Sequence, residues 1–424
     1  MRADRPRAPH RRTRAWLWAG FVVVHAIVAL LGWALPNQPM GDVYLVYEPW
    51  SEQALGGERI VGVTESWVYP ILALAPMLLT QALGFLGPYE IGWAVLVTAC
   101  DAAAFALLVG GGRSRGRVAA AWFWLVFALA LGPVGMYRLD AVTVPLAVAG
   151  VLWLAGRPPV AGALLAAATW IKIWPAALLA VAVAALWRAA RARALGLVVG
   201  AAVLSGVVVG VVAIAGGLPH LLGFVATQQD RGLQIEAPAA TPYVWGAVAG
   251  RDGWFLFYDR DILTFQVAGP GVDAVAAATT PLLALAAVAI AALAAVKTWR
   301  GAAVARVLPP AALALVLALI VCNRVGSPQF HAWLIAPLVL WLVWDRRRAW
   351  PLAALALVCA GLTQLVYPVA YWSLLGADPL GAALLSARNL ALVALLAWAL
   401  VRLARVPAGR DRARIGVDPL RSAA

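Results

Sequence analysis

Long apolar runs without charged residues recur along almost the whole chain and exclude an ordinary soluble fold. Only 12% of the 424 residues are charged, whereas a soluble protein has about 25%. Backbone groups inside a bilayer must be paired within their own segment, so these runs are expected to be helices. The sequence predicts an all-α, polytopic membrane protein with about 12 transmembrane helices, at 16–36, 68–86, 89–109, 118–136, 140–156, 158–187, 195–217, 272–297, 304–322, 329–344, 350–370 and 380–403.

Arginine-rich segments between these runs indicate the orientation. The formal net charge is +14, and the arginines cluster at 2–14, 113–117, 188–193, 346–348 and 402–421. Short basic segments beside apolar runs follow the positive-inside rule. We therefore expect residues 1–15 and 405–424 to be cytoplasmic and residues 16–404 to form one transmembrane domain in a bacterial plasma membrane. Because the cations lie between apolar runs, nucleic acid is not an expected partner.

Two topologies remain open for the first half of the chain. A simple count of crossings puts 113–117 outside, against the positive-inside rule. In the alternative, 68–86 is re-entrant or lies along the outer face. Segment 158–187 is then two short helices broken at 172–175, because proline interrupts a helix. This version also places Arg138, Asp140 and Lys172 on the outer side.

Both topologies put the loops 37–67 and 218–271 on the same, extracytoplasmic side, and these loops hold many of the acidic residues. Asp42 lies just after the first apolar run, at a membrane surface. Its carboxylate suits a general base acting on a sugar hydroxyl; the alternative is the N-cap of a surface helix. Tyr44 and Tyr47 share one face of such a helix, where they would stack on a sugar or anchor at the interface.

Charged residues at membrane level form a second group of candidates. Arg138 and Asp140 lie between two apolar runs, and Lys172 lies inside one. Ionisable groups at this depth face a polar cavity or a partner, so either a structural ion pair or a cationic phosphate pocket fits. Arg231, in a polar stretch of the second loop, is either a bidentate phosphate ligand or a solvated loop charge. Arg324 joins two later apolar runs close to the membrane.

Four further residues are supporting candidates for binding sugar or acceptor: Tyr69, Glu236, Gln329 and His331. Tyr69 precedes a proline at the start of an apolar run, where aromatic residues also serve as interface anchors. No spacing of His, Cys or acidic residues is typical of a metal site, so no metal is expected. No glycine-rich phosphate loop or dinucleotide fingerprint is present, so no soluble nucleotide donor or cofactor is expected either.

In this order, the motifs resemble bacterial membrane glycosyltransferases of the GT-C superfamily. The closest resemblance is to glycosyltransferase family 87, which includes polyprenyl-phosphate-mannose-dependent α-mannosyltransferases. The matching pieces are Gly41-Asp42-Val43-Tyr44 with Tyr47, Gly56-Gly57, Tyr69-Pro70, Arg138-Leu139-Asp140, Lys172-Ile173-Trp174-Pro175, Arg231-Gly232-Leu233-Gln234-Ile235-Glu236 and Ser327-Pro328-Gln329-Phe330. Together they cover residues 16 to about 345.

The resemblance implies a GT-C-type fold, a donor and a set of roles. The donor would be a polyprenyl-monophosphate sugar, most often mannose, and the acceptor a glycolipid or glycan. Asp42 matches the first-loop aspartate that is taken as the catalytic base of an inverting transfer. The four cations named above would hold the leaving phosphate. Two departures from related enzymes stand out: a single His331 near the Ser-Pro motif leaves the acceptor open, and a lone Asp42 argues against a metal-dependent oligosaccharyltransferase.

Two other function classes are alternatives to a glycosyltransferase. A flippase or transporter of lipid-linked glycans would need charges along both halves of a pathway, and no matching pair of broken helices indicates one. An O-antigen-ligase-like enzyme would use a diphosphate-linked donor instead of a monophosphate.

Overall fold

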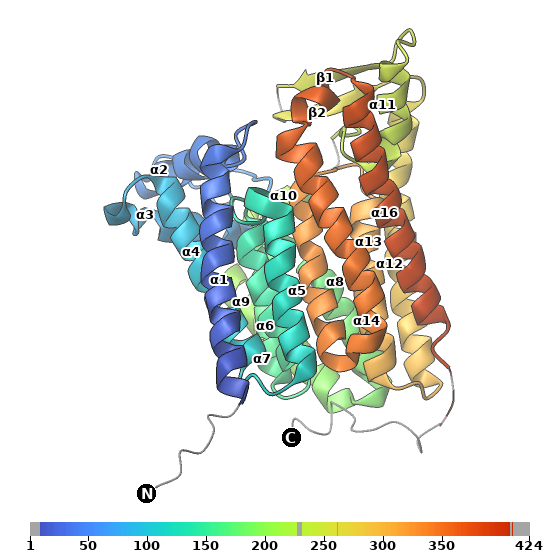
Figure 1. The fold of residues 1–424 in the computed structure, drawn as a ribbon. Helices are drawn as coiled ribbons and strands as arrows, with labels where there is room; N and C mark the ends of the chain where they lie inside the picture. Colours follow the sequence, from blue (N-terminus) through green and yellow to red (C-terminus); the bar gives the residue numbers. More distant parts are fainter. Residues whose placement is uncertain (1–8, 227–230, 261, 408, 410–424) are drawn as a thin grey trace, which may run out of the picture.

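The computed structural model describes residues 9–226, 231–260, 262–407 and 409, and most of them are helical (Figure 1). Most of the predicted cytoplasmic segments 1–15 and 405–424 lies outside these residues. The α-helices are α1 (Pro9–Ala34), α2 (Glu48–Leu55), α3 (Leu74–Gln81), α4 (Tyr89–Val109), α5 (Arg115–Leu131), α6 (Asp140–Trp153), α7 (Pro158–Ile171), α8 (Pro175–Ala189), α9 (Arg191–Ile214), α10 (Gly223–Ala226), α11 (Thr241–Val248), α12 (Val272–Trp299), α13 (Val304–Val321), α14 (Ile335–Gln364), α15 (Tyr371–Leu375) and α16 (Pro379–Ala404).

Short 3-10 and π turns extend or join these helices. The π turns are η1 (Val43–Tyr47) and η8 (Leu365–Val369). The 3-10 turns are η2 (Ile71–Ala73), η3 (Gly84–Leu86), η4 (Gly132–Gly135), η5 (Leu218–His220), η6 (Pro238–Ala240) and η7 (Pro328–Leu334). A single antiparallel hairpin of β1 (Phe255–Asp259) and β2 (Thr264–Ala268) pairs Phe255 with Ala268 and Asp259 with Thr264. No pattern in the sequence predicted this hairpin.

Eight helical segments within the described residues are long and apolar enough to cross a membrane. The prediction of an all-α, multi-pass membrane protein is therefore confirmed at this level. The segment Pro328–Val369 has 42 residues and breaks at Asp345, where φ is −149° and ψ is 74°. This break separates the two apolar runs predicted at 329–344 and 350–370.

Two predicted crossings are wrong as single spans. Segment 158–187 is divided into α7 and α8, because Lys172 is extended (φ −155°, ψ 134°) and Pro175 opens the second helix. Segment 68–86 contains only the 8-residue α3 between 3-10 turns. It lies beside α2 at the upper end of the bundle (Figure 1). The alternative topology of the sequence therefore describes this part of the chain.

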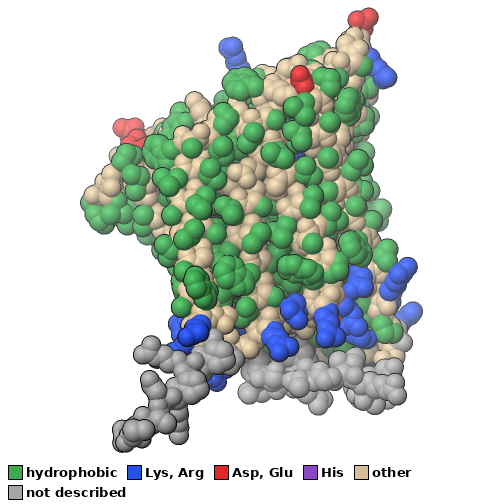
Figure 2. Space-filling model, in the orientation of Figure 1, with side chains coloured by type: hydrophobic (Ala, Val, Ile, Leu, Met, Phe, Trp, Pro, Cys, Tyr) green, Lys and Arg blue, Asp and Glu red, His purple; other side chains and the backbone are tan. Residues whose placement is uncertain are grey.

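The bundle has two chemically different ends. In Figure 2 the Lys and Arg side chains gather at the lower end, an apolar surface covers the middle, and acidic side chains appear at the upper end. Helix α2 from 37–67, and α11, β1 and β2 from 218–271, lie in the upper part of the bundle (Figure 1). Elements of both predicted loops therefore lie toward the same end of the bundle.

Helices α7 and α9 pack closely against each other. Gly162 of α7 lies directly against the backbone of Leu197, and Gly200 of α9 lies against the backbone of Pro159, so a Cβ at either position would overlap a carbonyl oxygen. Small residues at such contacts let membrane helices approach closely. This contact fixes α7, and with it Lys172 at the upper end of that helix.

Candidate functional site

Asp42 stands at the start of η1, at the upper end of the bundle. Its side chain makes no capping hydrogen bond to this turn, so the N-cap interpretation of the carboxylate is wrong. Instead, Asp42 Oδ2 lies 3.2 Å from Arg138 Nε, with the aspartate side chain 36% exposed and the arginine side chain 7% exposed. The carboxylate is thus held on one side by Arg138 and remains open on the other.

Arg138 is fully engaged by the protein. Its Nη1 donates to the carbonyl oxygens of Pro39 (2.9 Å) and Tyr137 (3.0 Å), and its Nη2 donates to the Tyr367 hydroxyl (3.3 Å). Burial lowers the pKa of the guanidinium. The charge of Asp42 and the contacts with Tyr367 raise that pKa by more than burial lowers it, so the net shift is upward. Arg138 therefore orients Asp42, and few of its donors remain for a phosphate.

Tyr367, in the η8 turn that follows α14, is a residue beside Arg138 that the sequence did not reveal. Its hydroxyl donates to the carbonyl oxygen of Asn37 (3.0 Å), and Asn37 Nδ2 donates to the carbonyl oxygen of Pro368 (2.6 Å). These bonds join the start of the Asp42 loop to a segment about 330 residues later. No local sequence signal predicts such a contact.

Asp140 and Lys172 form a buried ion pair. Lys172 Nζ lies 2.5 Å from Asp140 Oδ2, and Trp333 Nε1 donates to Asp140 Oδ1 at 2.5 Å. Asp140 is 1% exposed. Trp174 stacks on Trp333 at a ring separation of 5.6 Å and covers the pair. Of the two interpretations of the sequence, the structural ion pair is the one that the contacts show.

Tyr69 lies at the centre of these charges. Lys172 Nζ is 5.7 Å from the Tyr69 ring centre and 5.3 Å from the Phe330 ring centre. The pKa of Tyr69 is raised first by burial and then by two carboxylates, and it is lowered by two cations. Those four charged residues are Asp42, Asp140, Arg231 and Arg138. These four residues, with Tyr69 and Lys172, come from distant parts of the chain. Together we call them the Tyr69 cluster.

Arg231 is the cation of this cluster with unused donors. Its buried Nε has no hydrogen-bond partner among the described residues. Burial lowers the pKa of its guanidinium. Arg324 Nη1 donates to the Arg231 carbonyl oxygen (3.1 Å), and Arg324 Nη2 donates to Thr280 Oγ1 (2.8 Å). The structure thus places Arg324 behind the backbone of Arg231, where it supports this loop.

Other candidates are internal supports. Tyr47 is 1% exposed, and its hydroxyl accepts from the Leu139 amide (3.2 Å) beside Arg138, so it holds that turn rather than presenting a face to a sugar. His331 is also 1% exposed, and its Nδ1 lies 3.0 Å from the Pro328 carbonyl oxygen. Glu236 is buried against Arg388, at 2.5 Å. Tyr44 and Gln329 are half-buried.

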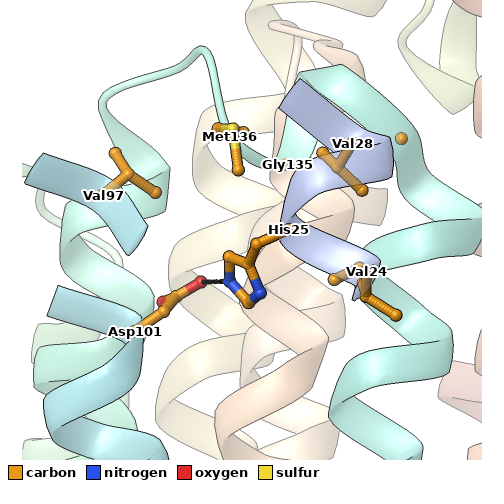
Figure 3. A pocket seen from close by; sticks show the side chains of 9 residues that line it. Val24, His25, Val28, Val97, Asp101, Gly135 and Met136 are labelled. Atoms are coloured by element: carbon orange, nitrogen blue, oxygen red, sulfur yellow. Dashed lines mark hydrogen bonds and ion pairs between the residues drawn. The ribbon is translucent and has the colours of Figure 1, made fainter. Parts of the chain in front are cut away.

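A second polar pair lies deep between α1 and α4, and the sequence analysis did not single it out. His25 Nε2 is 3.0 Å from Asp101 Oδ2, beside a cavity of about 20 Å³ that Met136 and Gly135 also line (Figure 3). His25 Nδ1 lies 2.9 Å from the Phe21 carbonyl oxygen. Because a carbonyl only accepts, Nδ1 carries a proton, and a single proton is then shared between Nε2 and Oδ2.

This pair is consequently neutral overall, whichever atom holds the shared proton. Neutrality explains how two titratable groups persist inside apolar helices, where a net charge is costly. The sequence signal was an acid, Asp101, in the middle of the apolar run 89–109. We assign the pair to the packing of α1 on α4 rather than to the Tyr69 cluster.

Comparisons with protein-family models, with curated proteins and with solved structures find no match for this chain. Within the described residues, no group of three or more His, Cys, Asp or Glu side chains is placed to hold a metal ion. The Tyr69 cluster is therefore the basis for the function proposed for this chain.

Proposed function

We propose that this chain is an integral-membrane glycosyltransferase. It moves a sugar, most simply mannose, from a polyprenyl monophosphate to a glycolipid or glycan acceptor on the extracytoplasmic face. The observation that carries the proposal is the half-exposed carboxylate of Asp42, held by Arg138 in the same cluster as Lys172 and the unpartnered Nε of Arg231. The resemblance to GT-C family 87 at these residues supports it.

A twelve-leg topology is consistent with this assignment. Eight long segments, the extra leg made by the break at Asp345, and the short helices α6, α7 and α8 supply the legs. With both termini cytoplasmic, the arginine clusters 113–117, 188–193 and 346–348 all fall on the cytoplasmic side, as the positive-inside rule requires.

The length of the short helices supports a site close to a lipid phosphate. Helices α6 and α7 have 14 residues each, which is about 21 Å of helix. A bilayer core is about 30 Å thick. With their lower ends at the cytoplasmic surface, the Asp140–Lys172 pair at their upper ends lies below the outer membrane surface. The phosphate of a polyprenyl donor would lie at the headgroup level, above this pair.

The reaction needs a general base and a phosphate-stabilising cation from these residues. Asp42 accepts the proton of the acceptor hydroxyl as the oxygen attacks the anomeric carbon from the face opposite the phosphate. The bond from that carbon to the phosphate oxygen breaks, and polyprenyl phosphate leaves with the bonding electron pair. Arg231 stabilises the charge that grows on the phosphate. The proton on Asp42 then passes to water, which restores the base.

The donor class can be tested directly. Purified protein in lipid nanodiscs is given polyprenyl-phosphate mannose or the matching diphosphate-linked sugar, with a mixture of glycolipid acceptors. We expect transfer from the monophosphate only. Transfer only from the diphosphate would favour the O-antigen-ligase-like alternative, and transfer from neither would remove the proposal.

A lipid-linked glycan transporter remains the second candidate, and the His25–Asp101 pair is the observation that favours it. Titratable pairs inside membranes occur in proton-coupled transporters. However, the Tyr69 cluster lies at one end of the bundle. Movement of a fluorescent lipid-linked glycan across the membrane of proteoliposomes, without any sugar transfer, would support the transporter instead.

A further inference from the structure

The loop that carries Arg231 is fastened along its length. The Gln234 amide donates to the Arg324 carbonyl oxygen (3.0 Å), and the Ile235 amide donates to the Phe265 carbonyl oxygen of β2 (3.1 Å). Gly326 lies so close to the backbone at Glu236 and Ala237 that it leaves no room for a Cβ. Residues 231–237 therefore form a strap between the hairpin and the segment after α13.

The far end of this strap is anchored by Arg388, from an apolar stretch of α16. Arg388 is 1% exposed and Glu236 is 4% exposed. Arg388 Nη1 lies 2.5 Å from Glu236 Oε2, and Nη2 donates to the Glu236 carbonyl oxygen at 2.6 Å. Its Nε and Nη2 also donate to Asn389 Oδ1 (3.2 and 2.9 Å), while Asn389 Nδ2 donates to Thr241 Oγ1 at 2.9 Å.

Packing alone does not require this arrangement. A buried ion pair is often no more stabilising than apolar residues of the same volume, because both charges lose their hydration. What the pair supplies is a fixed geometry: Arg388 grips both the side chain and the backbone of Glu236 with its planar guanidinium. Glu236 is only five residues from Arg231, so the position of one limits the position of the other.

We propose that Arg388 is a positioning residue for the donor phosphate. It acts through Glu236 and the 231–237 strap to hold the Arg231 guanidinium beside Tyr69. This inference rests on the proposed function, because it assumes that Arg231 binds a phosphate. It adds a residue about 150 positions away in the sequence that sets the affinity of that site.

A double-mutant cycle tests the route through Arg231. The variants are Arg388→Gln, Arg231→Gln and the double variant, with Arg402→Gln, at the other end of α16, as the matched control. Binding of polyprenyl phosphate alone is measured first, and KM for the donor and kcat are measured second. We expect each single variant to weaken binding of polyprenyl phosphate by about 10-fold, and to lower kcat as well, because the charge on the leaving phosphate is then less stabilised.

The double variant decides the matter. If Arg388 acts through Arg231, the double variant binds no more weakly than Arg231→Gln alone. Multiplicative losses in the double variant would overturn the inference, as would an Arg388→Gln protein that binds like the Arg402→Gln control. If Arg388→Gln does not fold, the same cycle is run with Asn389→Ala, which removes an acceptor of Arg388 without leaving a buried charge alone.

The binding measurement separates this inference from the proposed function. A wild-type protein that binds polyprenyl phosphate through Arg231 and Arg388 but transfers no sugar would contradict the transferase proposal alone. A protein that transfers sugar normally after the Arg388→Gln and Asn389→Ala changes would contradict the positioning role alone.

Discussion

Removing the charge of Asp140 should destabilise the protein, and removing the charge of Lys172 as well should restore most of the loss. Asp140→Asn keeps an acceptor for Trp333 Nε1 but leaves Lys172 Nζ, now 2.5 Å from a carboxylate, without a counter-charge. The two side chains are 1% and 13% exposed, so water screens the pair little. Breaking a buried pair from one side costs about 3–5 kcal/mol.

The double variant Asp140→Asn/Lys172→Met removes both charges and keeps the Trp333 bond. We expect it to lose only about 1 kcal/mol, because a neutral replacement of a buried pair is nearly as stable as the pair. The measurement is the free energy of unfolding in detergent, followed by tryptophan fluorescence against denaturant. Arg348→Gln, whose pair with Asp345 is half-exposed, is the control and should lose less than about 1 kcal/mol.

Two results would refute this reasoning. One is an Asp140→Asn protein that loses less than about 1 kcal/mol, which would mean that the pair is hydrated rather than buried. The other is a double variant no more stable than the single one, which would mean that the loss does not come from an unpaired Lys172.

Further predictions concern the supports of the site. Arg138→Lys keeps a cation beside Asp42 but loses the planar set of donors. Transfer should fall, and stability should fall as well because buried acceptors lose their donor; equal transfer rates would contradict the orienting role. Asp101→Ala should lower the free energy of unfolding by about 2 kcal/mol, because His25 Nε2 loses its hydrogen-bond partner. Asp101→Asn should lose less stability, and equal losses would argue against the shared proton. The pKa of Glu48 is raised by burial and by neighbouring acids, so the folded state binds more protons and stability falls as pH rises above about 4.3. Glu48→Gln should therefore raise the thermal midpoint at neutral pH but not below about pH 4, and a difference that persists in acid would contradict this cause.

Much of the architecture follows from the sequence because it is set by local chemistry. Uncharged apolar length predicts membrane helices, and arginine position predicts which helix ends lie together. The break at Lys172 was visible because Pro175 follows it. By contrast, the count of simple crossings failed at 68–86, where an apolar run is interrupted by Pro70 and Pro76 and holds only a short helix.

The site was only partly predictable, for a physical reason. Asp42, Arg138 and Lys172 stand out because charge is rare in apolar surroundings. The sequence does not say which partner each charge takes, since the partners are fixed by tertiary packing. Tyr367 and Arg388 are the clearest cases: both meet the outer loops across more than 150 residues. The structure thus divides the four predicted cations into those used internally and Arg231, which has a donor to spare.

The role of Asp42 as the base is tested most directly by the rate of sugar transfer after its charge is removed. Asp42→Asn keeps the shape of the side chain and can still accept from Arg138, while Glu58→Gln removes an exposed acid from the same loop as a control. Single-turnover transfer from polyprenyl-phosphate mannose should fall by about 10²–10⁴-fold in Asp42→Asn and stay unchanged in Glu58→Gln. An Asp42→Asn protein that transfers sugar as fast as the wild type would contradict the proposed mechanism.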